Sequence, residues 1–154
     1  MTTRSGKRDA AVGESQAPLP ALLTRARDIT IELLHRRLNE EGFDGIRYRH
    51  GSVFRFIDPE GSRLTVLAER SGLTKQAIAE LVDELERLGY VARATDPNDR
   101  RAKIIRLTEQ GMAGRAAAGR ILLNIERRWA RHFGQDRITM LRKTMEEIID
   151  LQSR

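Results

Sequence analysis

Residues 62–108 contain two short helix-like segments joined by a glycine turn, followed by two stretches rich in β-branched residues. In the first segment, Ser62 is placed to cap a helix that runs through Arg70. Gly72 can take the left-handed conformation that a tight turn between helices often needs. The positions expected to face inward are Leu64, Leu67 and Ala68. The run therefore predicts two helices in quick succession.

The second segment reads as an amphipathic helix. Thr74 is a suitable cap, residues 75–88 form the helix, and Gly89 ends it. Its apolar residues recur at the spacing of one helix face, which predicts a buried stripe. The stripe consists of Ile78, Leu81, Val82, Leu85 and Leu88.

The next segment has the character of a β-hairpin. Residues 90–94 and 103–107 are rich in alternating and β-branched residues. They bracket the sequence Asp-Pro-Asn-Asp-Arg-Arg, in which Pro97 and Asn98 favour a turn. The order helix, turn, helix, hairpin is that of a winged helix-turn-helix. We therefore expect a mainly α fold with a small β-hairpin wing.

Further helices are expected before this run. Pro18 and Pro20 are tolerated in the first turn of a helix that Gly42 ends. A shorter helix is expected over residues 51–57, with Val53, Phe54 and Ile57 inward. The first 17 residues have little to bury, which predicts a disordered tail.

Two helices are expected after the run. Thr108 opens the first, Gly134 breaks it, and Asp136 is placed to cap the second. The apolar stripe of the first is Ala117, Ile121, Leu122, Ile125 and Trp129. The stripe of the second is Ile138, Leu141, Met145, Ile148 and Ile149. Residues 21–38 and 113–149 thus carry more apolar side chains than one small winged domain could cover. This favours a dimer, in which a second copy of the chain covers them, over a monomer in which these helices pack only on one another.

Composition narrows the function. The chain has 28 Lys+Arg against 22 Asp+Glu, and this excess of +6 favours a polyanionic partner. Without cysteine, thiolate chemistry, disulfides and thiol redox sensing are excluded. The three histidines fit no metal-ligand spacing, and no nucleophile elbow, Walker loop or dinucleotide glycine pattern is present, so we expect no enzyme, cofactor or metal. Without an apolar run long enough for a membrane span or a signal peptide, we expect a cytoplasmic protein. Glu84 is expected to pair with Arg87.

Candidate DNA contacts lie on the second helix and on the hairpin. A recognition helix reads base edges from its first turn, where Gln can pair with adenine and Lys can donate to guanine. The polar face of this helix carries Thr74, Lys75, Gln76 and Glu80. Residues 91–107 hold five basic and two acidic side chains, a net +3, and two adjacent arginines at a hairpin tip can enter a minor groove. The hairpin candidates are Arg93, Asp99, Arg100, Arg101 and Lys103.

At these residues the chain resembles the multiple antibiotic resistance regulator (MarR) family. The resemblance rests on LTVLAERSGLTKQAIAELVDELERLGYVAR and DPNDRRAKIIRLTEQG, and by pattern it covers about residues 20–151. It implies a homodimer that binds a pseudo-palindromic operator, usually as a repressor. Arg101 corresponds to the family's minor-groove arginine, and Asp99 to the acid that supports it.

Under this resemblance we expect a dimerisation helix over residues 18–44, a winged helix-turn-helix DNA-binding domain over 45–108, and dimerisation helices over 109–154. The family also implies release from DNA by a small aromatic or phenolic ligand. Six residues are candidates for lining the pocket that would bind this ligand, although each of them could instead be a core or surface residue. They are His35, Arg47, Tyr48, His50, Phe54 and Trp129. The alternative is a winged-helix module that binds protein rather than DNA.

Overall fold

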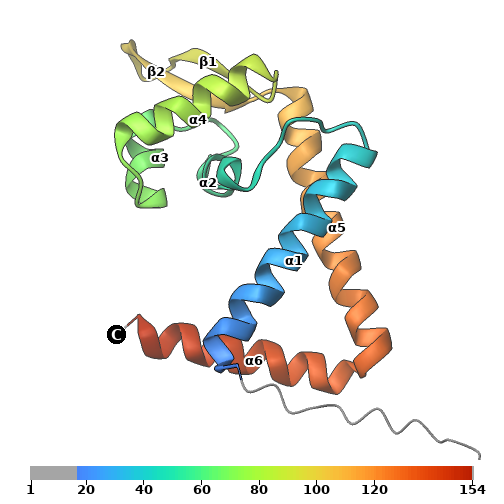
Figure 1. Cartoon of the computed structure of the whole chain (residues 1–154). Coiled ribbons are helices and arrows are strands. Elements are labelled where there is room, and N and C mark those ends of the chain that lie inside the picture. Colours follow the sequence, from blue (N-terminus) through green and yellow to red (C-terminus); the bar gives the residue numbers. More distant parts are fainter. Residues whose placement is uncertain (1–16, 154) are drawn as a thin grey trace, which may run out of the picture.

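The computed structural model describes residues 17–153, so almost all of the expected N-terminal tail lies outside the described residues. A winged-helix lobe is joined to three long helices (Figure 1). The lobe contains η1 (Tyr48–His50), α2 (Gly51–Phe56), α3 (Leu64–Ser71), α4 (Lys75–Arg87), β1 (Val91–Asp96) and β2 (Asp99–Leu107). The arm helices are α1 (Leu19–Glu40), α5 (Glu109–Phe133) and α6 (Gln135–Gln152). This arrangement confirms the predicted fold class.

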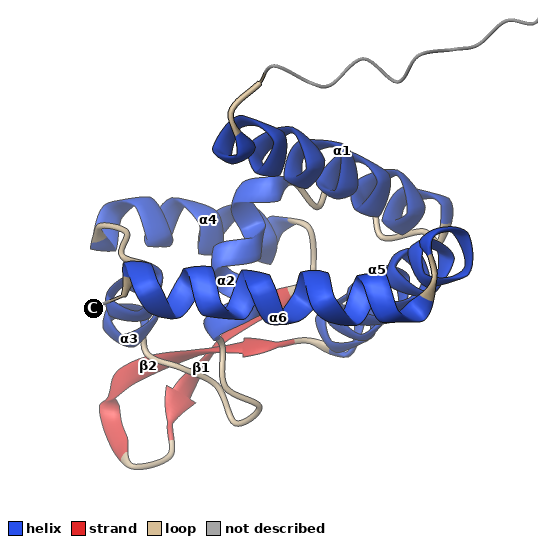
Figure 2. Ribbon diagram, turned by 90° about the horizontal axis from the view of Figure 1, so that it is seen from below, coloured by secondary structure: helices blue, strands red, loops and turns tan. Residues whose placement is uncertain are grey.

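The arm helices meet beside the lobe and then diverge. Figure 1 shows α1 and α5 leaving the lobe together, and α6 folding back from the far end of α5. Figure 2, seen from below, separates α6 from α1. The contact between α1 and α5 is a small apolar cluster of Leu34, Leu38, Ala117, Ile121 and Ile125. The cluster occupies only the part of the arms nearest the lobe.

The lobe has its own core, to which α4 contributes one face. Ile78, Leu81, Val82 and Leu85 are all buried, as their spacing predicts. Leu88 was predicted to join them, and this prediction is wrong, because its side chain is 38% exposed. The helix ends at Arg87, so Leu88 turns away from the stripe and lies against Gly45.

The turn between α3 and α4 forms as predicted, but α3 begins differently. Gly72 has a φ of 69°, the left-handed conformation expected of it. Ser62 does not cap α3, whose N-terminal cap position is Arg63. Instead, the Ser62 hydroxyl bonds Asp58, and its backbone exchanges hydrogen bonds of 2.9 and 2.8 Å with Ile105. Pairing with β2 therefore takes precedence over helix capping at Ser62.

The hairpin is longer than the sequence predicts, and its connection is shorter. The strands pair from Val91↔Leu107 down to Asp96↔Asp99, which leaves two residues in the turn. The pair before the last is Thr95↔Lys103, so residues 100–102 have no counterpart in β1. They form a bulge, which bends a strand and redirects its side chains. Arg100 and Arg101 therefore lie in a bulge of β2, not in the loop between the strands that the sequence predicts.

The start of α5 is tied closely to the end of the lobe. Thr108 caps α5 as predicted, with its hydroxyl oxygen accepting from the Gly111 N–H at 3.0 Å. A Cβ atom on Gly111 would lie 1.9 Å from the Tyr90 carbonyl oxygen, so only glycine fits there. At the other end, Gly134 separates α5 from α6, whereas Asp136 lies in the first turn of α6 and makes no capping bond, contrary to prediction.

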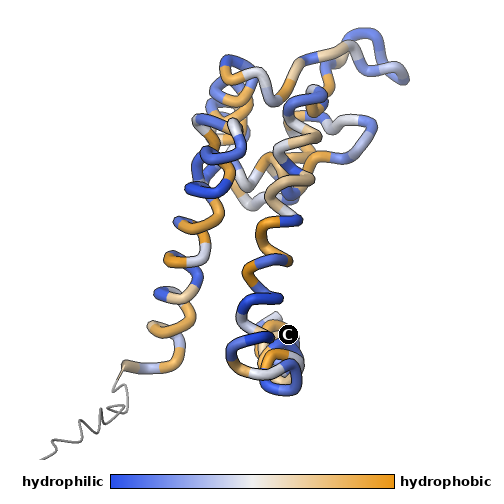
Figure 3. The backbone as a smooth tube through the Cα atoms, turned by 90° about the vertical axis from the view of Figure 1, so that its right-hand side faces the viewer, coloured by the Kyte–Doolittle hydropathy of each residue, from blue (hydrophilic) through white to orange (hydrophobic). Residues whose placement is uncertain are grey.

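Large apolar side chains stay exposed along the arms of a single copy. Orange turns recur along α1, α5 and α6 in the hydropathy view (Figure 3). Four residues of the predicted stripes are among the exposed ones: Leu122, Trp129, Leu141 and Ile149. Others are Leu19, Leu22, Ile29, Leu123, Phe133, Met140 and Leu151. Within residues 17–153, none of the helices is both long and apolar enough to cross a membrane.

Candidate nucleic-acid interface

Helix α4 presents a polar first turn to solvent. The Thr74 hydroxyl oxygen accepts from the Ala77 N–H at 3.1 Å, which fixes the start of the helix as predicted. Lys75, Gln76 and Glu80 are all exposed; Gln76 and Glu80 lie on the face opposite the buried stripe, and Lys75 lies beside the stripe in the first turn. The Gln76 amide lies 3.5 Å from the Glu80 carboxylate, so the two side chains restrain each other. The side chains of this turn are exposed and therefore keep hydrogen-bond donors and acceptors that a ligand could use.

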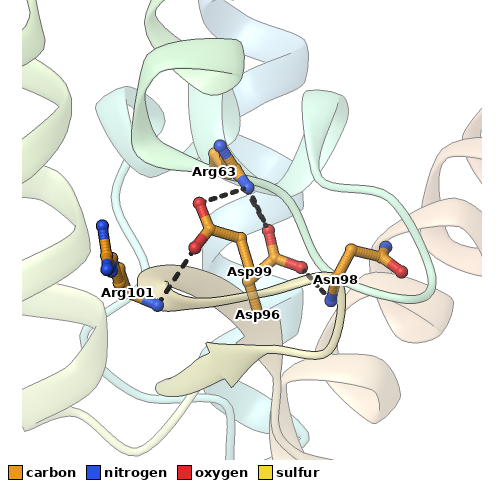
Figure 4. Close-up of polar contacts among 5 residues, drawn as sticks. All are labelled: Arg63, Asp96, Asn98, Asp99 and Arg101. Atoms are coloured by element: carbon orange, nitrogen blue, oxygen red, sulfur yellow. Dashed lines mark hydrogen bonds and ion pairs between the residues drawn. The ribbon is translucent and has the colours of Figure 1, made fainter.

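The tip of the hairpin is braced by two aspartates and an arginine from outside the hairpin (Figure 4). Asp96 accepts from the Asn98 backbone N–H at 2.8 Å, which closes the turn. Arg63, at the start of α3, contacts Asp96 at 2.7 Å and Asp99 at 3.4 Å. Asp99 also accepts from the backbone N–H of Arg101 at 3.1 Å. The wing is therefore fastened to the helix-turn-helix through Arg63.

Electrostatics of this cluster follow from its hydrogen bonds. The Asn98 N–H, followed by the Arg63 guanidinium, holds the pKa of Asp96 below its usual range. The same carboxylate raises the pKa of Arg63. Asp96 is almost fully buried, and a buried carboxylate needs such partners to stay ionised. Asp96 is thus a fixed negative charge inside a wing whose net charge is positive.

The wing arginines have different surroundings. Arg100 and Arg101 are exposed, and their guanidinium groups bond no other described residue. Asp99 was expected to support the Arg101 side chain, but it accepts from the Arg101 backbone N–H, and the guanidinium that it contacts is that of Arg63. Arg93 is ion-paired with Asp83, at 2.6 Å, and with Glu86 on α4. The Lys103 ammonium reaches the Thr95 hydroxyl at 3.3 Å. The two bulge arginines are therefore available for a ligand, whereas the Arg93 guanidinium is already paired with the carboxylates of α4.

Sequence reasoning missed Arg63. It stands at the N-terminal cap position of α3, where the helix dipole and free N–H groups disfavour a cation. An arginine at such a position is a signal that a carboxylate must lie nearby, but the sequence does not show that Asp96, 33 residues away, supplies it.

The chain is similar in sequence and in fold to known transcriptional regulators. A family model described as MarR family matches residues 44–102. The crystal structure of CouR from Rhodococcus jostii RHA1, bound to p-coumaroyl-CoA, is 31% identical, with 87% of this chain and 95% of that chain covered and a TM-score of 0.63. The chain belongs to the MarR family of transcriptional regulators.

Two other relatives agree with this membership. A MarR-family transcriptional regulator from Rhodococcus sp. RHA1 is 29% identical, with 87% of this chain and 97% of that chain covered and a TM-score of 0.62. An HTH-type transcriptional regulator from Bacillus subtilis (strain 168), YcgE, is 51% identical over 39 residues, which span a quarter of each protein. MarR-family members are transcriptional regulators, not enzymes, in agreement with the expectation from the sequence.

In this MarR-family chain, three of the six ligand candidates come together. His35, Arg47 and Phe54 line a cavity of about 100 Å³ between α1, α2 and α5. The other walls are mainly apolar: Leu34, Leu38, Ile46, Gly51, Gly114, Arg115 and Ala118. Burial lowers the pKa of His35. The cavity is thus apolar, with a few polar groups at its edges.

The other three candidates lie elsewhere. Tyr48 is 59% exposed and lies against the Arg27 guanidinium. Trp129 lines a separate open groove near Leu33 and Arg128. His50 is buried and hydrogen-bonded to Glu84. Glu84 was expected to pair with Arg87, but it forms its ion pair with Arg49. These residues therefore do not share the small cavity.

Proposed function

We propose that this MarR-family regulator is a homodimeric, sequence-specific DNA-binding repressor. One observation carries the proposal. The exposed polar turn of α4 and the unpaired arginines of the β2 bulge belong to one lobe, on the side away from α6 (Figure 1). A recognition helix and a basic wing at one surface fit adjacent grooves of one duplex.

In the proposed complex, α4 enters the major groove and the wing reaches the flanking minor groove. Lys75 and Gln76 then face base edges, with Thr74 and Glu80 at the margins of the contact. Arg101 enters the minor groove, where the negative potential is strongest at narrow A·T-rich sequence. Arg100 and Lys103 contact phosphates beside it. Arg93 contributes to this surface mainly by holding β1 against α4.

The arms support the dimer. Large apolar side chains are exposed on all three arm helices, and exposed apolar surface of this kind marks an interaction site. A symmetric partner would cover that surface with the same residues of its own chain. Two recognition helices would then lie about 34–36 Å apart, one turn of DNA, and would read a pseudo-palindrome.

The cavity supports a role for a small aromatic or phenolic effector. It lies where α1 and α5 of the arms meet α2 of the lobe, so an occupant would press on both. CouR, the relative at 31% identity, was solved with p-coumaroyl-CoA bound. We propose that an aromatic ligand entering this cavity shifts the lobes and releases DNA. A role on DNA also carries the expectation of a cytoplasmic location.

The alternative, a winged helix that binds protein, predicts no DNA complex. An electrophoretic mobility shift on the region upstream of the protein's own gene separates the two. We expect binding by the unaltered chain, a clear loss for Arg101→Ala, and little change for Arg131→Ala. The latter removes an equal charge from an exposed site in the last turn of α5. Equal binding by both variants, at equal folding and across salt concentrations, contradicts the assignment of Arg101.

A further inference from the structure

Residues 43–50, here called the connector, run from the end of α1 into the lobe and include η1. Phe43 and Ile46 pack against both apolar clusters, the one between the arms and the one inside the lobe. The Tyr90 hydroxyl, from the lobe core, donates to the Asp44 carbonyl oxygen at 2.8 Å. Arg47 lines the cavity between arm and lobe. The connector is therefore in direct contact with both halves of the molecule.

His50, at the end of the connector, is buried and fully hydrogen-bonded. It is only 1% exposed. Its Nδ1 accepts from the Arg47 backbone N–H at 3.0 Å, so that nitrogen carries no proton. Its Nε2 lies 2.9 Å from a Glu84 oxygen and must therefore be the protonated nitrogen, which donates to the carboxylate. His50 thus joins the connector backbone to a side chain of α4.

Glu84 is held from two sides. One carboxylate oxygen accepts from His50, and the other accepts from the Arg49 guanidinium at 2.5 Å. The hydrogen bond from His50 is the main cause that lowers the pKa of Glu84. The exposed contact with Arg49 contributes little, because water and salt screen it. The directional contact that counts is the one with the buried histidine.

Helix α4 is held to the lobe by its buried apolar stripe and, toward β1, by the ion pairs of Asp83 and Glu86 with Arg93. The hydrogen bond from His50 to Glu84 adds a directional attachment between α4 and the connector. Glu84 is nine residues from Lys75, about 13.5 Å along a rigid helix. A small rotation or slide at Glu84 therefore moves the first turn, where base edges would be read.

We propose that His50 and Glu84 are positioning residues that form a latch, which sets the orientation of the recognition helix and so the preference for the operator over other DNA. The latch rests on the proposed function, because it acts on DNA reading. It touches no DNA itself. Its loss lowers the preference for the operator while leaving the sequence-independent attraction to phosphate intact, because that attraction depends on the basic surface.

The test compares two duplexes by fluorescence anisotropy. One is the duplex that the unaltered chain selects from a random pool, and the other is a scrambled duplex of the same composition. For Glu84→Ala we expect the ratio of the two affinities to fall about tenfold, as for loss of one charged hydrogen bond. Affinity for the scrambled duplex should not fall, because the variant has one negative charge fewer. Glu84→Gln should keep most of the ratio, since its amide oxygen can still accept from His50.

Glu69→Ala is the matched control, because it removes the same side chain from an exposed position on α3. A ratio in Glu84→Ala equal to that in Glu69→Ala would overturn the latch alone. So would an equal loss in Glu84→Gln and Glu84→Ala, because charge and not the hydrogen bond would then be responsible. An unaltered chain that prefers no duplex would overturn the proposed function and the latch together.

A second pair of variants covers the case in which Glu84→Ala does not fold. The amide of His50→Asn takes the place of Nδ1 and keeps the bond to Arg47, but it is too short to reach α4. The amide of His50→Gln takes the place of Nε2 and keeps the bond to Glu84. We expect His50→Asn to lose the preference and His50→Gln to keep it. The reverse order, at equal melting temperatures, contradicts the latch.

Discussion

Arg63 and Asp96 form an ion pair of 2.7 Å between the start of α3 and the last residue of β1. Asp96 is nearly buried, whereas the arginine remains partly exposed. The pair joins the helix-turn-helix to the tip of the wing, and through Asp99 it extends to the backbone of Arg101. The position of the bulge arginines therefore depends on a residue that lies outside the hairpin.

The first prediction concerns this pair. Arg63→Ala removes the brace but none of the proposed base or minor-groove contacts. We expect weaker operator binding, by less than the loss in Arg101→Ala, for which about 1–3 kcal/mol is typical of a direct contact. Arg63→Lys should recover part of the binding, because an ammonium can approach Asp96 but not both aspartates at once. A loss in Arg63→Ala greater than in Arg101→Ala, measured by anisotropy, contradicts a bracing role.

The second prediction is a pH dependence of stability. Because the pKa of Asp96 is lowered in the folded chain, its ionised form stabilises the fold. This contribution is complete above the pKa of an unfolded aspartate, about 3.9, and disappears as the pH falls through the lower folded pKa. We expect the free energy of unfolding to drop with acid in that window.

Asp96→Asn isolates the contribution of this group. The variant keeps an oxygen that can accept from the Asn98 N–H but has no carboxylate to titrate. Its free energy of unfolding should fall less steeply with acid than that of the unaltered chain. Some dependence on acid should remain in both, because the pKa values of Asp58, Glu84 and Glu41 are also lowered. Identical slopes, measured by urea unfolding at several pH values, would show that Asp96 contributes nothing to the acid response.

The third prediction compares two glycines of α5. A Cβ at Gly111 meets the Tyr90 carbonyl oxygen, whereas a Cβ at Gly119 meets nothing within 4 Å. Gly111→Ala should therefore destabilise the chain by about 1–3 kcal/mol or more, as overpacking does. Gly119→Ala should stabilise it by up to about 1 kcal/mol, the difference in helix propensity. Equal melting temperatures for the two variants would disprove the close approach.

The sequence predicts helix starts and buried helix faces correctly where the deciding interactions lie within a few residues along the chain. Thr74 and Thr108 cap their helices, and the stripe from Ile78 to Leu85 is buried, because spacing and capping act within a few residues. Ser62 shows the limit of this reasoning. It has the chemistry of a cap, but a partner 43 residues away, Ile105, claims its backbone.

The site was predictable in its composition but not in its geometry. Residue types marked the α4 turn and the paired arginines as candidates. The bulge that holds Arg100 and Arg101 depends on strand register, and the brace depends on Arg63, which is distant in sequence. The cavity brings together His35 of α1 and Phe54 of α2, which only tertiary packing decides. The assignment of individual DNA contacts stays a prediction.

If two copies of this lobe read one operator, as we propose, selection of bound duplexes from a random pool should reveal it. We expect one enriched inverted repeat, with half-site centres about 10 base pairs apart, and loss of enrichment for Arg101→Ala. A single unrepeated half-site, or no enrichment by the unaltered chain, would contradict it.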